Sequence, residues 1–204
     1  MINPVNLLRD SIKSGMKSLA KFLDTVSGGR ITPTMITLTG LFAHIVIAWL
    51  IVQDKYVFGA LALIVFGLFD ALDGALARYQ KVDSPKGMLL DSITDRLKEP
   101  LIYTALAYSL VHNNNPYIAI WAIPACSVSI LISYINAWGE VVTKSDTSHT
   151  TNKAFRGGFL PFEIRISLII ISLLFNIVPG MLVVITVLGA ATAALRMQSI
   201  MQRL

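Results

Sequence analysis

Four aspartates lie at the neighbouring ends of two consecutive apolar runs of the chain: Asp70, Asp73, Asp91 and Asp95. The first two are spaced i, i+3 and the last two i, i+4, so each pair lies on one face of a helix. Carboxylates gathered this densely repel one another unless they are protonated or neutralised. An all-oxygen cluster without His or Cys suits Mg²⁺ or Mn²⁺ rather than Zn²⁺. We therefore predict a metal site, in which two helices can hold two ions about 3.5–4 Å apart, as in phosphoryl displacement.

Small residues accompany the aspartates. Gly74 follows Asp73, Ala77 continues the same helical face, and Gly87 opens the next helix. Small residues let two helices approach closely. For Gly87, packing and ligand binding are equally compatible with the sequence. For Gly74, we favour a role in leaving space for a bound base or phosphate.

The elements that carry these residues are apolar helices. The chain has 204 residues, of which 54% are hydrophobic and 14% charged, well below the ~25% charged residues of a typical soluble domain. A bilayer-spanning helix needs ~20 mostly apolar residues. Such runs occur at residues 35–53, 56–78, 88–111, 116–139, 162–177 and 179–197. The predicted fold is an all-α integral membrane protein with six transmembrane helices.

Basic residues are concentrated on one side of this arrangement. They precede the first run and follow the second, fourth and sixth. By the positive-inside rule, both termini and the aspartate cluster face the cytoplasm, and we expect the chain in the plasma (inner) membrane. The net charge of +5 is therefore directed at lipid and does not indicate nucleic acid binding.

Residues 4–26 form a separate predicted element. Apolar and basic side chains recur there at helical spacing: Leu8, Ile12, Leu19 and Leu23, with Lys13, Lys17 and Lys21. A basic amphipathic helix of this kind lies in the membrane interface. We therefore expect an interfacial segment at residues 1–30 and a transmembrane catalytic domain at 31–204.

The spacing D-x2-D-G-x2-A-R-x8-G-x3-D-x3-D runs without a mismatch from Asp70 to Asp95. It resembles the signature of the CDP-alcohol phosphotransferases, membrane enzymes of phospholipid synthesis. The predicted six-helix layout with a preceding interfacial helix is also similar to this family over nearly the whole chain.

The resemblance implies a role for each matching residue. Asp70, Asp73 and Asp91 would bind two divalent metal ions, either Mg²⁺ or Mn²⁺. Asp95 would also approach the metals and act as the catalytic base toward the acceptor hydroxyl. The residues expected to receive the cytidine nucleotide and its diphosphate are Gly74, Ala77, Arg78 and Gly87. Members of the family usually form homodimers, so we expect one here.

The implied reaction is attack by an alcohol on the phosphorus of CDP-diacylglycerol, with CMP leaving. The chain's layout is similar to that of the phosphatidylglycerophosphate and phosphatidylinositol phosphate synthases, which favours a small phosphorylated polyol as acceptor. Such members carry a basic residue after a Ser-Tyr pair in the fourth span, where this chain has Asn136. The expected acceptor-binding residues are Arg96, Asn136, Arg156 and Arg165.

Two other functions are compatible with parts of the pattern. A member of the same family can use a soluble CDP-alcohol and a lipid acceptor such as diacylglycerol. A divalent-cation transporter would also need intramembrane carboxylates. The transporter is disfavoured because the four aspartates lie near one membrane surface, and no acidic residue continues a path through the other half of any span.

Overall fold

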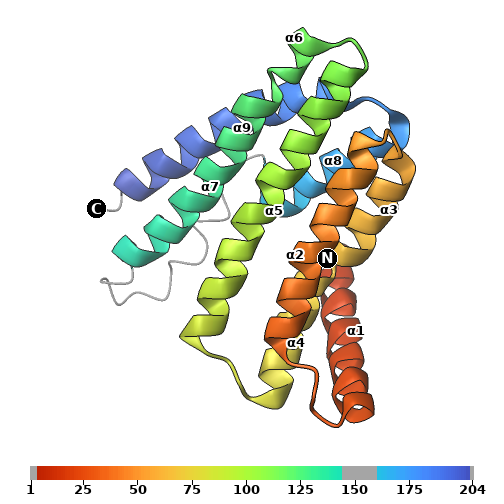
Figure 1. The fold of residues 1–204 in the computed structure, drawn as a ribbon. Helices are drawn as coiled ribbons and strands as arrows, with labels where there is room; N and C mark the ends of the chain where they lie inside the picture. The colour runs from red at the N-terminus through yellow and green to blue at the C-terminus, as the bar shows by residue number, and fades with distance from the viewer. Residues whose placement is uncertain (1–3, 144–159, 203–204) are drawn as a thin grey trace. The chain divides into compact units, whose positions relative to one another are not determined.

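The structure, a computed structural model, describes residues 4–143 and 160–202, which form helices and no strand (Figure 1). The helices in these ranges are α1 (Pro4–Ser27), α2 (Pro33–Val52), α3 (Tyr56–Gly67), α4 (Phe69–Gln80), α5 (Pro85–His112), α6 (Pro116–Ala119), α7 (Ala122–Thr143), α8 (Phe162–Phe175) and α9 (Val178–Met201). The all-α prediction is confirmed for the described part of the chain.

Four stretches within the described residues are long and apolar enough to cross a membrane: Pro33–Val52, Tyr56–Gln80, Pro116–Gly139 and Val178–Met201. They correspond to the first, second, fourth and sixth predicted spans. The other two predicted spans fall on α5, whose first half carries the charged site residues, and on α8. Helix α8 has 14 residues, about 21 Å of length. That the chain crosses the membrane six times stays a prediction.

The chain divides into two compact units. The first consists of Met1–Ile47 and Leu61–Lys98, and the second of Ala48–Ala60 and Glu99–Leu204. All four aspartates of the signature belong to the first unit.

In the first unit, α1 packs along α4 (Figure 1). Their contact is apolar and centres on Ala20, Ile36, Leu72, Ala75 and Leu76. Since Leu72, Ala75 and Leu76 alternate with the site residues on α4, one face of this helix is buried against α1. The other face is left to carry the aspartates.

The end of α1 is tied to the end of α4. Gly28 and Gly29 adopt positive φ angles of 61° and 76°, which glycine accepts without steric cost, and they terminate the helix. The side-chain amide of Gln80 donates to the Asp24 carboxylate at 2.7 Å and to the Ile31 carbonyl at 2.9 Å. These bonds fix the last turn of α4 against the turn that follows α1.

A short connection joins α4 to α5. Lys81 ends α4 in the left-handed conformation, with φ of 57°, and Pro85 begins α5. The hydroxyl of Ser84 accepts the backbone N–H of Gly87 at 3.1 Å, so it caps the first turn of α5.

In the second unit, α7 packs along α9 (Figure 1). Gly189 of α9 lies against Val128 of α7 so closely that a Cβ atom at Gly189 would overlap the valine Cγ1. This glycine is required by helix packing.

The turn between α2 and α3 is held by Asp54. Its carboxylate accepts hydrogen bonds from the Ser109 hydroxyl at 2.6 Å, the Asn113 amide at 2.9 Å and the Tyr56 hydroxyl at 3.1 Å. These bonds, the one from Ser109 above all, lower the pKa of Asp54 below its ordinary value. The bonds attach the turn to the end of α5.

Candidate active site

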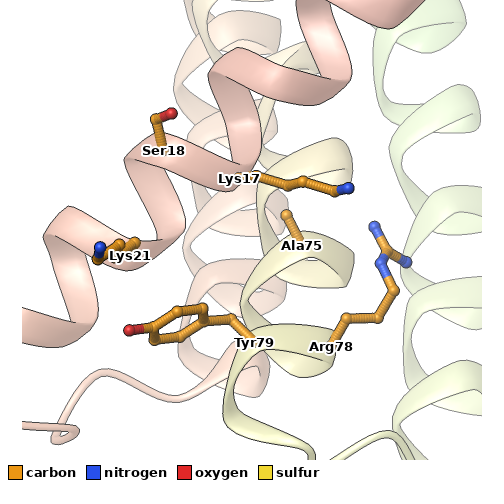
Figure 2. A pocket seen from close by; sticks show the side chains of 6 residues that line it. All are labelled: Lys17, Ser18, Lys21, Ala75, Arg78 and Tyr79. Atoms are coloured by element: carbon orange, nitrogen blue, oxygen red, sulfur yellow. The ribbon is translucent and has the colours of Figure 1, made fainter.

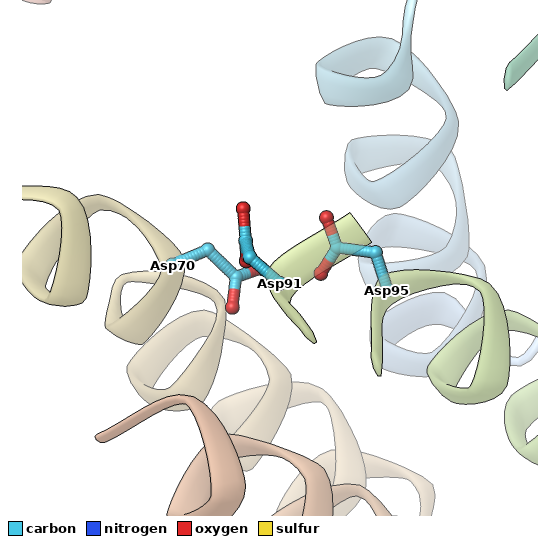
Figure 3. A group of neighbouring side chains, drawn as sticks. All are labelled: Asp70, Asp91 and Asp95. Atoms are coloured by element: carbon cyan, nitrogen blue, oxygen red, sulfur yellow. The ribbon is translucent and has the colours of Figure 1, made fainter. Parts of the chain in front are cut away.

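Helices α4 and α5 bring three of the predicted ligands together. Asp70 lies in the first turn of α4, and Asp91 and Asp95 lie one turn apart on α5. One carboxylate oxygen from each lies within 4.8 Å of the others, and Figure 3 shows the three side chains converging. Of the four predicted metal ligands, the structure thus brings these three together.

Asp73 stands apart from this group. It is only 5% exposed, and its Oδ2 atom accepts a hydrogen bond of 2.6 Å from the Thr37 hydroxyl of α2. The partner of Asp73 is therefore an uncharged hydroxyl group and not a cation. Its role as a metal ligand stays a prediction.

A buried lysine completes the cluster. Lys98 is 5% exposed, and its ammonium lies 2.6 Å from Oδ1 of Asp70 and 3.0 Å from Oδ1 of Asp95. Gly40 of α2 faces it, since a Cβ atom there would lie 3.9 Å from Nζ. Two acidic residues from different helices thus share one cation supplied by the chain itself.

Lys98 was not among the site residues predicted from the sequence. The available signal was its spacing: Lys98 follows Asp95 by three residues and Asp91 by seven, which places all three on one face of α5. Thr37 carried no such signal, because its contact with Asp73 depends on how α2 and α4 pack.

The residues present fit a divalent metal ion. Oδ1 of Asp91 is buried and has no hydrogen-bond partner among the described residues. A buried charged oxygen without a partner is costly, and Lys98 serves only Asp70 and Asp95. A cation bound among the three carboxylates would satisfy the Asp91 oxygen, and an all-oxygen set suits Mg²⁺ or Mn²⁺.

The two glycines of the motif are not packed against a neighbouring helix in the described part of the chain. A Cβ atom at Gly74 would meet only the Arg78 guanidinium, 3.4 Å from Nη1. One at Gly87 would meet only the Ser84 hydroxyl, also at 3.4 Å. Gly189, by contrast, lies in direct contact with a side chain of a neighbouring helix. The open space beside Gly74 and Gly87 therefore favours ligand binding over helix packing as the reason for these glycines. Ala77 is half-buried on the same helix.

Two expected acceptor residues lie in the second unit and have partners there. Arg165 is 2% exposed, and its Nη2 atom donates to Glu99 at 3.2 Å and to Ser133 at 3.3 Å. Asn136 accepts a bond of 2.6 Å from Nη1 of Arg196. Arg196, which is 4% exposed, was not among the predicted acceptor residues, although a second arginine inside a predicted span was a usable signal.

The remaining two expected acceptor residues contribute less. Arg96 belongs to the first unit, and its Nη1 atom donates to the Ser92 carbonyl of its own helix at 2.8 Å. Arg156 lies outside the described residues. The structure therefore does not bring the four expected acceptor residues into one group.

Comparisons with known proteins agree with the motif. The family model described as CDP-alcohol phosphatidyltransferase matches residues 30–195. The phosphatidylinositol phosphate synthase of Corynebacterium glutamicum is 31% identical over 114 residues, which cover 54% of this chain and 52% of that protein. The enzyme of the same name from Mycobacterium tuberculosis is 32% identical over 112 residues, covering 54% and 52%. The chain thus spans about half the length of the curated relatives it matches.

Two solved structures share the fold over most of the chain. Both are of Mycobacterium tuberculosis phosphatidylinositol phosphate synthase, one with CDP-DAG bound and one in complex with manganese and citrate. Each has a TM-score of 0.76 and 23% identity and covers 91% of this chain, together with 92% and 88% of the respective structure.

Proposed function

Since the chain belongs to the CDP-alcohol phosphatidyltransferase family, we propose that it transfers the phosphatidyl group of CDP-diacylglycerol to a small phosphorylated polyol and releases CMP. The observation that carries this proposal is the cluster of Asp70, Asp91 and Asp95, whose oxygens lie within 4.8 Å of one another, inside a complete family motif.

These three carboxylates would bind two divalent metal ions, either Mg²⁺ or Mn²⁺, and Asp73 would be the fourth ligand. A divalent ion in this position supplies positive charge to the diphosphate and to the leaving CMP. Oδ1 of Asp91, which has no hydrogen-bond partner within residues 4–143 and 160–202, supports this assignment.

Asp95 is the base in this proposal. The acceptor oxygen forms a bond to the phosphatidyl phosphorus, the bond from that phosphorus to CMP breaks, and the hydroxyl proton passes to the Asp95 carboxylate. Lys98 donates to Oδ1 of Asp95, which leaves Oδ2 for the proton. The exposed Arg78 guanidinium offers a forked donor to the donor's phosphate oxygens, beside the open surfaces of Gly74, Ala77 and Gly87.

A phosphorylated acceptor is supported by the arginines of the second unit. Arg165 and Arg196 are 2% and 4% exposed, and guanidinium groups match phosphate oxygens in geometry and charge. The family's usual cation is replaced by Asn136, but Arg196 donates to Asn136 at 2.6 Å. A guanidinium group thus lies beside the position where the motif lacks a basic residue.

We further propose the membrane arrangement expected from the sequence. Six spans would include α5 and α8, residues 1–30 would lie in the interface, and the active site and both termini would face the cytoplasm of the inner membrane. The basic residues outside the apolar runs support this orientation. A homodimer is proposed on the family resemblance.

The test is CMP release by the purified full chain with CDP-diacylglycerol and Mg²⁺ or Mn²⁺. Acceptors are offered one at a time: glycerol 3-phosphate, inositol 1-phosphate, free inositol and serine. Metal-dependent release with a phosphorylated polyol alone is the expected result. Release with free inositol or serine would refute the phosphorylated acceptor while keeping the transferase.

A matched pair of variants controls the assay. Asp91→Asn should abolish release, whereas Asp83→Asn makes the same chemical change at an exposed loop position and should leave it intact. If the chain instead consumed a CDP-alcohol with diacylglycerol and ignored CDP-diacylglycerol, the proposed donor and acceptor would be wrong.

A further inference from the structure

A threonine of α2 is in contact with the fourth aspartate of the motif. Thr37 and Asp73 are 4% and 5% exposed, and the Thr37 hydroxyl donates to Oδ2 of Asp73 at 2.6 Å. This distance lies in the short range of hydrogen bonds from a hydroxyl to a carboxylate. The bond joins two helices of the first unit, because Asp73 belongs to α4.

The place of this hydroxyl is set by the backbone of α2. Oγ1 of Thr37 also lies 3.1 Å from the carbonyl of Pro33, one turn earlier. A hydroxyl has one proton, and the shorter contact, with a charged acceptor, takes it. The contact with the carbonyl identifies the rotamer, since a helical threonine chooses between two and one of them turns Oγ1 toward the preceding turn.

Apolar packing holds α2 and α4 together at this point. Ile36 and Leu72, which directly precede Thr37 and Asp73 in the sequence, are 6% and 5% exposed and belong to one core cluster. Ala75, of the same cluster, lines the pocket between α1 and α4 that is shown in Figure 2. The hydrogen bond is therefore anchored on both sides by buried neighbours, and its donor cannot move independently of α4.

We propose that Thr37 is a positioning residue for the metal site. Its hydroxyl holds Oδ2 of Asp73 and leaves the other oxygen of this carboxylate for a divalent ion. This inference rests on the proposed function, in which Asp73 is the fourth ligand. Groups that hydrogen-bond to a metal ligand typically change metal affinity by about 10–100-fold when they are removed.

The test measures Mn²⁺ binding by the purified full chain, without donor or acceptor, from the electron paramagnetic resonance signal of free Mn²⁺. Thr37→Val keeps the shape of the side chain without its hydroxyl and should weaken Mn²⁺ binding by about tenfold or more. Thr37→Ala also lacks the hydroxyl and should weaken binding to the same degree. Thr37→Ser keeps the hydroxyl, so its affinity should stay within about threefold of the wild type.

A double-variant cycle separates positioning from a general loss of stability. If the hydroxyl acts through Asp73, adding Thr37→Val to Asp73→Asn should not weaken Mn²⁺ binding further. Thr192→Val is the matched control in the second unit, because Thr192 is 0% exposed and its hydroxyl donates to the Leu188 carbonyl at 2.7 Å. This variant should melt at a lower temperature than the wild type and bind Mn²⁺ with unchanged affinity.

Three outcomes would overturn the inference. Unchanged affinity in Thr37→Val would mean that the hydroxyl only fills space between the helices. Tighter binding would mean that it holds Asp73 away from the ion. An equal loss in the wild-type and Asp73→Asn backgrounds would mean that it acts through another group. If the wild type itself bound no Mn²⁺, the proposed metal-dependent function would fail too, whereas a wild type that binds beside unaffected variants refutes the role of Thr37 alone.

Discussion

Asp91 and Asp95 are one turn apart on α5, yet their surroundings differ. Oδ1 of Asp91 has no partner among the described residues, whereas Oδ1 of Asp95 accepts from Lys98 at 3.0 Å. The first oxygen needs a cation from outside the chain, and the second already has one. This difference is consistent with the proposed roles of Asp91 as a metal ligand and Asp95 as the base.

We expect Asp91→Asn to lose Mn²⁺ binding together with turnover, because an amide oxygen cannot replace a carboxylate in a cluster of this charge. Asp95→Asn should still bind CMP but should lose at least about 10² in the rate of transfer, the usual contribution of a positioned base. Calorimetry with CMP and a CMP-release assay separate the two. Normal turnover by the Asp91→Asn enzyme would contradict the metal assignment.

In the proposed site, Lys98 would compete with the metal ion for the oxygens of Asp70 and Asp95. Two opposite charges at 4 Å attract by about 4 kcal/mol at an effective dielectric constant near 20, so removing this ammonium should tighten Mn²⁺ binding. For Lys98→Met we expect at least about tenfold tighter binding, measured by the electron paramagnetic resonance signal of free Mn²⁺. The metal-free variant should melt at a lower temperature than the wild type, because its carboxylates have lost their counter-charge.

Lys86→Met is the control, since this lysine is exposed at the start of α5 and forms no ion pair with any described residue. Weaker Mn²⁺ binding by Lys98→Met would show that the lysine organises the carboxylates for the metal and does not oppose it.

At the scale of elements, the contact of α7 with α9 depends on Gly189 having no side chain. A Cβ atom at Gly189 would overlap Val128 Cγ1, so the two helices must separate or repack around any larger residue. Overpacking of this kind costs about 1–3 kcal/mol. We expect Gly189→Ala to lower the melting temperature and Val128→Ala to restore part of the loss in the double variant.

Gly74→Ala provides the comparison. Its Cβ atom would lie 3.4 Å from the flexible end of Arg78, so the melting temperature should stay near that of the wild type. If Gly189→Ala also left the melting temperature unchanged, α7 and α9 would not pack as closely at Gly189 as described.

The turn between α2 and α3 should respond to pH through Asp54. Hydrogen bonds, first that from Ser109, hold its pKa below the ordinary value of 3.8, so the unfolded chain binds this proton more readily than the folded one. The stabilisation is therefore present above the unfolded pKa and is lost as the pH falls through the lowered, folded pKa.

Asp54→Asn isolates that effect, because asparagine tolerates the left-handed backbone that Asp54 adopts with φ of 55°. Near pH 6 the variant should be less stable by about 1 kcal/mol or less, since the group is exposed. The difference in melting temperature from the wild type should shrink as the pH falls below the ordinary pKa of 3.8. A difference that stayed constant with pH would mean that the carboxylate charge contributes nothing.

At the scale of the whole molecule, metal binding should appear as global stability. An ion that binds only the folded chain stabilises it by about 2.7 kcal/mol at a hundred times its dissociation constant. We expect Mn²⁺ to raise the melting temperature, EDTA to reverse the rise, and Asp91→Asn to show no rise. An equal rise in that variant would place the ion elsewhere.

The sequence was a good guide where a property depends on spacing along one helix. The i, i+3 and i, i+4 pairs predicted the meeting of Asp70 with Asp91 and Asp95, and the long apolar runs predicted the helices. It was a poor guide where a property depends on which helices pack together. The hydrogen bond from Thr37 to Asp73 and that from Arg196 to Asn136 join residues far apart in the chain, and no periodicity within one element marks them.

The short link between α4 and α5 also bears on how the protein is made. Every side chain of the cluster, from Asp70 to Lys98, comes from two consecutive helices joined by residues 81–84. Closing so short a loop costs little chain entropy and is fast. We therefore expect the acidic cluster to assemble as soon as residue 98 has left the ribosome, before α8 and α9 are synthesised. The acidic cluster would thus be among the first tertiary structure that this chain acquires.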